Sequence, residues 1–213
     1  MSNDQNDSNQ NFAHLGITDT YREDNQLIEG LVSGDREAYR ALVDKYQVKV
    51  IRTCIGFVHS TADAEDIAQE VFIEVFRSVD RFRGDSELST WIYRIAVNRS
   101  LNFLKSSARR KVVSFLTGQS DEKEPWVPEK QAGQESSPDE AIIRSEQARA
   151  LEKALSSLPE NQRTAFVLNK YDDLPYKEIA DVMNISIGSV ESLIFRAKQN
   201  LQKKLHDFYK KNI

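Results

Sequence analysis

Helical periodicity is the feature of this chain that most restricts its fold. Apolar residues recur at spacings of three and four along most of the 213 residues, and no segment alternates as a half-buried strand does. Glycine and proline, which interrupt regular structure, number only 8 and 5. The strongest pattern covers 62–80, with a stripe of Ala64, Ile67, Ala68, Val71, Phe72, Val75, Phe76 and Val79. The sequence therefore predicts an all-α fold with this stripe in a core.

One polar segment divides the helical pattern in two. Residues 114–140 hold three of the five prolines and many acids, a composition typical of a flexible acidic linker. We predict two small helical domains on either side of it, one over 24–113 with a break near "VSGD" and one over 141–213. The acidic, amide-rich residues 1–23 are expected to form a disordered tail.

Composition excludes several classes of protein. No apolar run approaches the length that spans a bilayer, and the N-terminus has no apolar secretory segment, so we expect no direct membrane contact. Cys54 is the only cysteine, which rules out an intrachain disulfide and fits a cytoplasmic location. The three histidines are His14, His59 and His206. Their scatter offers no metal-ligand spacing, so we expect no metal and no cofactor.

Charge is distributed unevenly along the chain. Between Glu87 and Asp121 there is no acid, and this gap holds Arg94, Arg99, Lys105, Arg109, Arg110 and Lys111. A second basic cluster near the C-terminus comprises Arg196, Lys198, Lys203, Lys204, Lys210 and Lys211. Two basic segments joined by an acidic tether indicate two contacts with a polyanion. Charge alone supports equally the alternative that both clusters are solvated helix faces.

The stretch "RGDSELSTWIYRIAVNRS" at 83–100 passes from a polar turn into a helix. At 100° per residue, one stripe of that helix carries Arg94, Asn98, Asn102 and Lys105, with Trp91 at its edge. Cations bind phosphates, amides bond base edges, and a flat ring stacks on an unpaired base, which is worth roughly 1–3 kcal/mol. The alternative is that Trp91 belongs to the core and the stripe is ordinary surface.

A helix-turn-helix is predicted over 172–205, "DDLPYKEIADVMNISIGSVESLIFRAKQNLQKKL". A short helix at 176–183 is followed by Asn184, which tolerates the left-handed conformation that the turn requires. The second helix then begins at Ser186 or Gly188. In DNA-binding members of this class the second helix enters the major groove. Similar turns also occur in proteins that never contact DNA.

Taken together, 63–111 and 155–201 resemble the bacterial extracytoplasmic-function sigma factors, the small two-domain initiation subunits of RNA polymerase. The quoted segments that carry the resemblance are "DAEDIAQEVFIEVFRSVDRFRGDSELSTWIYRIAVNRSLNFLKSSARRK" and "LSSLPENQRTAFVLNKYDDLPYKEIADVMNISIGSVESLIFRAKQNL". The resemblance implies that 24–113 is sigma region 2 and 141–213 is sigma region 4. It also implies that the chain binds core polymerase, recognises the −10 and −35 promoter elements and promotes strand opening.

The resemblance assigns roles to three sets of residues. For the −10 element, as duplex and as non-template single strand, the set is Phe82, Arg83, Gly84, Asp85, Ser86, Thr90, Trp91, Arg94, Asn98 and Arg99. For the −35 element it is Ser189, Glu191, Ser192, Phe195, Arg196 and Gln199. For the clamp helices of the polymerase's largest subunit it is Asp63, Asp66, Gln69, Glu70 and Ile73. An anti-sigma protein is a further partner that the resemblance allows.

Two features depart from the family pattern: the residues at 191 and 193, and an N-terminal tail of some 20 residues that is longer than the family's usual short start. Family members commonly carry arginines where Glu191 and Leu193 stand, so the −35 sequence differs or its contacts are weaker. Glu191 could accept a hydrogen bond from cytosine N4.

Three other functions compete with that of a sigma factor. An operator-binding regulator would bind duplex DNA tightly without polymerase. A structural adaptor would use Trp91 for folding alone. An enzyme is disfavoured because the chain has no Gly-rich phosphate loop and no nucleophile–base cluster, so no catalytic residue is expected.

Overall fold

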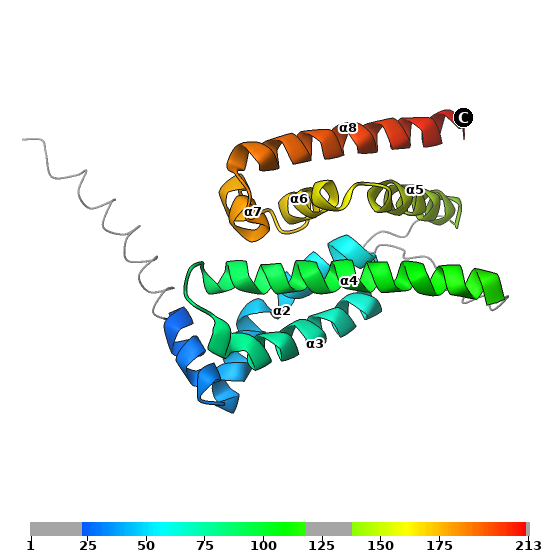
Figure 1. Cartoon of the computed structure of the whole chain (residues 1–213). Coiled ribbons are helices and arrows are strands. Elements are labelled where there is room, and N and C mark those ends of the chain that lie inside the picture. The colour runs from blue at the N-terminus through cyan, green and yellow to red at the C-terminus, as the bar shows by residue number, and fades with distance from the viewer. Residues whose placement is uncertain (1–22, 118–137, 212–213) are drawn as a thin grey trace, which may run out of the picture.

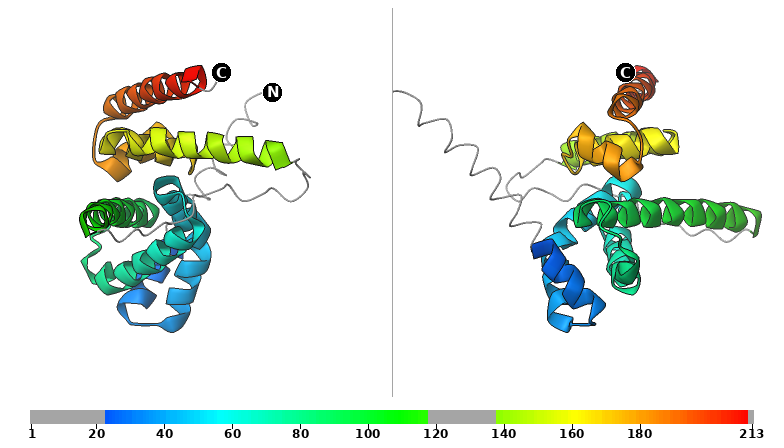
Figure 2. Two further views of the ribbon diagram at one scale, coloured as in Figure 1. Left: turned by 90° about the vertical axis from the view of Figure 1, so that its right-hand side faces the viewer. Right: turned by 60° about the vertical axis from the view of Figure 1, so that its left-hand side comes forward.

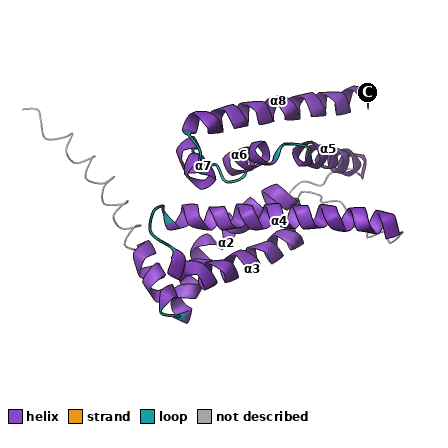
Figure 3. Cartoon of the chain, viewed as in Figure 1, coloured by secondary structure: helices purple, strands orange, loops and turns teal. Residues whose placement is uncertain are grey.

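The computed structural model describes residues 23–117 and 138–211, and over these residues it contains helices and no strand (Figures 1 and 3). The elements are α2 (Arg36–Val58), α3 (Thr61–Ser78), the 3-10 turn η1 (Val79–Arg81), α4 (Leu88–Thr117), α5 (Pro138–Ser156), α6 (Glu160–Lys170), α7 (Tyr176–Met183) and α8 (Ile187–Lys211). Residues 23–32 are also helical. The predicted all-α fold is confirmed.

Short polar side chains set the starts of the first helices. The Asp35 carboxylate accepts the backbone N–H of Glu37 at 2.9 Å where α2 begins. The Ser60 hydroxyl accepts the N–H of Asp63 at 3.2 Å where α3 begins. Both bonds satisfy amides that the first turn of a helix leaves unpaired. The predicted break near "VSGD" is the turn before α2, where Gly34 adopts a φ of 77°.

Helix α3 buries the predicted apolar stripe with one exception. The buried members are Ala64, Ile67, Ala68, Val71, Phe72 and Val75, and Val79 follows in η1. Phe76 was expected in the core, and that expectation is wrong, because its side chain is 42% exposed. Its ring meets Tyr39 edge-on with the centroids 5.6 Å apart, at the rim of the bundle. The exposed Ile73 belongs to the same region of the surface.

The C-terminal half forms the predicted helix-turn-helix. Asn184 follows α7 in the left-handed conformation, with φ 53° and ψ 50°, and its N–H reaches back to the Ala180 carbonyl. The Ser186 hydroxyl accepts the N–H of Ser189 at 3.2 Å and so caps the start of α8. The buried apolar residues of the helix-turn-helix include Ile179, Ala180, Val182, Val190, Ile194 and Ala197.

The helices extend into both ends of the predicted linker 114–140. Helix α4 continues to Thr117, and α5 already begins at Pro138. Proline suits the first turn of a helix, because the N–H that it lacks would have no partner there. Residues 118–137 between them lie outside the described part of the chain, as do residues 1–22 of the predicted tail.

The two helical units pack directly against each other. Figure 1 shows α8, the row of α5–α7, α4, and the pair α2 and α3 as successive layers, and α4 contacts α7 while α2 contacts α6. The turned views of Figure 2 show the same order. One buried cluster crosses the junction, made of Phe57, Tyr93, Val97 and Leu101 from the first unit and Ala165, Val167, Leu168, Leu174, Ile179, Ala180, Val182, Val190 and Ile194 from the second. The sequence predicts two domains but not their shared core.

Candidate nucleic-acid interface

The aromatic pair Phe82 and Trp91 marks the start of the predicted −10 segment. Their ring centroids lie 5.2 Å apart and the planes are tilted by 47°. Trp91 is half-buried and packs against the core of the first unit. Trp91 therefore lies between the two alternatives, a core residue and a surface residue for base stacking. It packs against the core, and part of its side chain remains exposed. An exposed ring surface is what base stacking requires.

The turn between these two aromatics holds the next predicted contacts. Arg83, Gly84 and Asp85 are exposed, and Ser86 is half-buried. Gly84 has a φ of 73°, which side chains other than hydrogen seldom permit, so this glycine serves the turn itself. Thr90 is only 5% exposed, so in this arrangement its hydroxyl is withdrawn from the surface.

Arg94 is engaged by the other half of the chain. Its Nη2 donates to the Asp181 carbonyl at 2.6 Å and its Nε donates to the Val182 carbonyl at 3.3 Å. Both acceptors lie in the last turn of α7, where helix carbonyls lack intrahelical partners and attract cations. The cation predicted to bind a DNA phosphate thus caps α7 instead.

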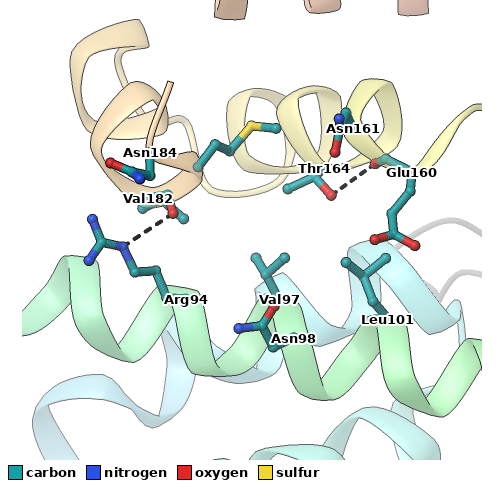
Figure 4. Close-up of a pocket in the computed structure, with 10 residues that line it drawn as sticks. Arg94, Val97, Asn98, Leu101, Glu160, Asn161, Thr164, Val182 and Asn184 are labelled. Carbon is teal, nitrogen blue, oxygen red and sulfur yellow. Dashed lines mark hydrogen bonds between the residues drawn. The ribbon is translucent and has the colours of Figure 1, made fainter. Parts of the chain in front are cut away.

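Asn98 is exposed and lines a hollow between α4 on one side and α6 and α7 on the other (Figure 4). The hollow is lined by Arg94, Val97, Asn98, Leu101, Glu160, Asn161, Thr164, Val182, Met183 and Asn184. Lys105, further along the same stripe, pairs with Glu160 of α6 at 2.9 Å. We call Trp91, Arg94 and Asn98 the strand-binding face. Two of its three residues border the hollow: Arg94 is engaged by α7, whereas the side chain of Asn98 stays exposed inside the hollow.

Arg99 of α4 connects the predicted −10 contacts to the predicted polymerase contacts on α3. Its guanidinium pairs with Glu74 at 2.6 Å and with Glu70 at 3.4 Å, both on α3. Glu70 was predicted to dock on polymerase and Arg99 to contact the −10 element. The two regions are therefore physically adjacent.

The predicted −35 contacts occupy an open face of α8, which we call the reading face. Its members are Ser189, Glu191, Ser192, Phe195, Arg196 and Gln199, and all six are exposed. Helix α8 is the outermost layer in Figure 1, on the far side of α6 from α4. Phe195 is 60% exposed and Ile187, at the start of the helix, is 51% exposed. The sequence analysis did not single out Ile187, although its place outside the buried stripe of α8 could have indicated it.

The predicted polymerase contacts form a docking face on α3. Asp66, Gln69, Glu70 and Ile73 are exposed, and Asp63 is half-buried. Beside them lies an apolar hollow lined by Gly34, Arg36, Tyr39, Ile73, Phe76 and Arg77. Helical spacing could not reveal this hollow, because Tyr39 belongs to α2 and only the packing of two helices brings it beside Phe76.

A buried carboxyl lies between the two units. Asp172 accepts the Thr53 hydroxyl at 3.0 Å, while its other oxygen, Oδ1, has no hydrogen-bond partner in the described part of the chain. Burial raises the pKa of Asp172 to about 7, against the opposing contributions of the Thr53 bond and the Arg52 charge. Beside it, Arg52 donates to the Tyr171 carbonyl and pairs with Asp173 at 3.0 Å. None of these contacts could be read from sequence spacing.

Within 23–117 and 138–211, no group of three or more His, Cys, Asp or Glu side chains is placed to hold a metal ion. Among the helices of those same ranges, none is both long and apolar enough to cross a membrane.

Comparison with known proteins identifies both halves. Residues 42–110 match the family model of sigma-70 region 2, and residues 148–201 match that of sigma-70 region 4. The chain is 38% identical to the RNA polymerase sigma-H factor of Pseudomonas aeruginosa over 186 residues, which cover 87% of this chain and 95% of that protein. It is 37% identical to the ECF RNA polymerase sigma-E factor of Escherichia coli K12 over 182 residues, covering 85% and 94%.

Solved structures share the fold. CnrH in complex with the cytosolic domain of CnrY matches with a TM-score of 0.59 at 20% identity, over 87% of this chain and 98% of CnrH. The sigma factor RpoE of Bartonella quintana, solved with the anti-sigma factor NepR, matches with a TM-score of 0.55 at 21% identity, over 79% and 96%. At this level of identity the likeness shows a common arrangement of helices.

A region 2 bundle followed by a region 4 helix-turn-helix defines a sigma factor, a promoter-recognising subunit for transcription initiation by RNA polymerase. The identity and coverage of the relatives place the chain further: it belongs to the extracytoplasmic-function sigma factors.

Proposed function

We propose that the strand-binding face holds the non-template strand of the −10 element after the duplex opens. The observation that carries this proposal is the half-buried Trp91, fixed beside Phe82 at 5.2 Å and next to an exposed turn. A ring fixed by packing loses little freedom when a base stacks on it. Arg94 supplies a cation for the backbone, and Asn98 supplies donors and acceptors for a base edge.

The reading face of α8 contacts the −35 element in the major groove. Its exposed residues lie on the second helix of the helix-turn-helix, which is the helix that enters the groove in this class of protein. Arg196 is suited to a phosphate or a guanine edge, and Glu191 to cytosine N4. A carboxylate on this face also repels nearby phosphates, so Glu191 favours a particular sequence rather than tight binding to any DNA.

The docking face binds the clamp helices of the largest polymerase subunit. The apolar hollow at Ile73, Phe76 and Tyr39 can accept an aliphatic side chain. Arg36 and Arg77 line the hollow and favour an acidic group there, while the exposed Asp66 and Glu70 elsewhere on α3 favour basic groups of the partner. Sites of this kind combine a small apolar centre with a polar rim.

Further parts of the proposal concern partners and location. The Bartonella relative was solved with an anti-sigma factor. We propose that a protein of that kind also binds this chain, that the chain works in the cytoplasm, and that it has no catalytic site or cofactor of its own. The −10 and −35 assignments of single residues belong to this proposal as well.

The test is run-off transcription with purified core polymerase over a library of promoter sequences. The proposal expects transcripts only when chain and core are both present, from templates that share two elements. An operator-binding regulator would instead bind duplex DNA tightly without core polymerase and would not start transcripts. The selected templates also report the sequences of both elements.

A further inference from the structure

The hollow beside the docking face has an apolar centre and a basic rim. Its volume is about 470 Å³, and the residues that line it are Gly34, Arg36, Tyr39, Ile73, Phe76 and Arg77. Both ionised residues of this set are arginines, so we call it the arginine-flanked hollow. Its apolar side chains remain accessible, since Ile73 is 45% and Phe76 is 42% exposed. Accessible apolar surface inside a polar rim is typical of a site that another molecule covers.

The two arginines carry charges that the described part of the chain does not neutralise. Within 23–117 and 138–211, neither Arg36 nor Arg77 forms an ion pair or a side-chain hydrogen bond, and both are exposed. Glu37 and Glu74, their acidic neighbours in the chain, pair with other arginines at 3.0 and 2.6 Å. Guanidinium groups bind carboxylates in charge-assisted hydrogen bonds. The rim of the hollow therefore favours a ligand with carboxylates beside an apolar group.

The charge of the exposed face of α3 reverses along the helix. Asp66 and Glu70 are exposed before Ile73, and Arg77 follows it one turn later. At 1.5 Å per residue, Arg77 lies about 10 Å beyond Glu70 along the helix axis. A basic surface selected by the two acids would meet like charge if it extended over the hollow. The arginine-flanked hollow therefore requires a partner of the opposite charge to the one that the acids select.

The shape of the hollow favours a protein side chain over a small molecule. Five of the six lining residues are exposed, so the hollow is open to solvent. Small-molecule sites enclose about 70–90% of the surface of their ligand, which an open hollow cannot do. A side chain that projects from a protein needs less enclosure, because the contacts around it exclude water.

The aromatic residues of the hollow argue against a nucleic acid. Tyr39 and Phe76 pack edge to face, with their ring planes at 81°, so that one ring covers a face of the other. Stacking of unpaired bases requires open ring faces. The exposed carboxylates of Asp66 and Glu70 on the same helix also repel phosphates.

We propose that the arginine-flanked hollow is a docking site for an acidic segment of a second protein. An aliphatic side chain of that segment enters the apolar centre, and carboxylates on either side of it pair with Arg36 and Arg77. The proposal rests on the proposed function in one respect, namely that polymerase is held by the acids of α3. The chain then binds a basic and an acidic partner on neighbouring parts of one surface.

The test titrates the full chain into a fluorescein-labelled peptide of alternating Asp and Leu and follows the anisotropy. Saturable binding is expected, at least about tenfold tighter than binding of the matched Lys-Leu peptide, because the rim is cationic. An Asp-Gly peptide lacks the apolar side chains and should bind at least about tenfold more weakly than the Asp-Leu peptide.

Charge reversals locate the peptide on the chain. Arg36→Glu and Arg77→Glu should each weaken the Asp-Leu peptide about tenfold or more, because an attraction becomes a repulsion. Arg40→Glu is the matched control: Arg40 is exposed on the same helix as Arg36 but does not line the hollow. It makes the same change in net charge and should alter the affinity by less than about twofold.

A titration with core polymerase separates the two proposals. The Asp-Leu peptide should still bind when the chain is saturated with core, and Asp66→Lys should weaken core without weakening the peptide. Displacement of the peptide by core would assign the hollow to polymerase and overturn the second partner, while the docking face stands. Core binding that is unchanged in Asp66→Lys and Ile73→Ala would instead contradict the docking face.

Four further results would each overturn the acidic partner. They are no saturation at millimolar Asp-Leu peptide, equal affinity for the Lys-Leu peptide, equal losses in Arg40→Glu and Arg36→Glu, and tighter binding of an oligothymidine that Arg77→Glu abolishes. The last of these would assign the hollow to a nucleic acid. A chain dimer that Arg77→Glu dissociates in sedimentation would likewise replace the second protein by a second copy of the chain.

Discussion

The reading face of α8 and the strand-binding face of α4 are built from the same materials and meet different surroundings. Each places a cation, an amide and an aromatic ring on a helix. All six residues of the reading face are exposed and free of the other unit, whereas Arg94 caps α7 and the exposed Asn98 lines a hollow shared with α6 and α7. Helical periodicity shows which side chains leave the core of their own bundle. It cannot show that another domain of the chain will cover them.

The largest effect is expected at Trp91. Trp91→Ala removes the stacking surface, which is worth roughly 1–3 kcal/mol per base, and should reduce promoter opening by holoenzyme about tenfold or more. Permanganate reactivity of unpaired thymines measures the opening. Trp91→Phe keeps a ring and serves as control, with a smaller loss. Normal opening by Trp91→Ala would mean that α4 does not hold the strand.

A second change tests the docking face on α3, which lies away from the contact between the two helical units. Ile73→Ala removes apolar surface next to Phe76 and should weaken the binding of core polymerase about tenfold, since burying such a side chain is worth about 1.5–3 kcal/mol. Fluorescence titration of labelled chain with core measures the affinity. The distance between the two halves should not change. Unaltered polymerase binding would exclude this face as the docking site.

The reading face predicts an effect on specificity. Glu191→Gln should change the base preferred at one −35 position, by about fivefold or more, because a carboxylate that accepts from cytosine N4 is replaced by an amide. Transcription from promoters with each base at every −35 position measures this preference. Glu191 is exposed, so stability should not change and thermal unfolding provides the control. An unchanged profile would place Glu191 outside the DNA contact.

The smallest expected effect is that of pH on the closed form. Burial raises the pKa of Asp172 to about 7. In separated halves the exposed carboxyl would titrate near ~4, so the closed form binds more protons between these values and gains stability as the pH falls. Between pH 8 and 6.5, Asp172 alone would raise the closed-to-open ratio about fourfold. The distribution of distances between spin labels on cysteines introduced at two exposed positions, Arg40→Cys in the first unit and Lys203→Cys in the second, measures this ratio.

The lower end of that pH range is set by a histidine. Burial, together with the nearby Arg163 charge, lowers the pKa of His59 to about 4. Protonation of His59 in open molecules therefore opposes closing as the pH falls towards 6.5 and below, and it roughly halves the rise due to Asp172. Asp172→Asn is the control and should remove that rise, leaving only the opposite dependence due to His59. A variant that keeps the same dependence would assign it to another group.

The sequence predicts those parts of the molecule that depend on residues close together in the chain. The buried stripe of α3, the left-handed Asn184 and the exposed residues of α8 all follow from helical spacing or from the preference of one residue. Phe76 breaks the pattern because the bundle ends beside it, and a helical wheel contains no information about where a partner helix stops.

The junction could not be predicted because its contacts depend on tertiary approach. Arg94 binds backbone carbonyls of Asp181 and Val182, and any residue types there would offer the same acceptors. Gly56 is the one local signal, since a glycine inside an otherwise continuous helical pattern indicates close approach of another segment. Even so, it does not reveal that the segment is α6.

The most direct test of the account is whether DNA and the helix-turn-helix compete for α4. The spin-labelled chain is titrated, without polymerase, with the single-stranded −10 sequence, and both bound DNA and the distance between the halves are followed. The account predicts that the distance increases in proportion to the DNA bound. Saturating DNA with the halves still at their short separation would contradict it.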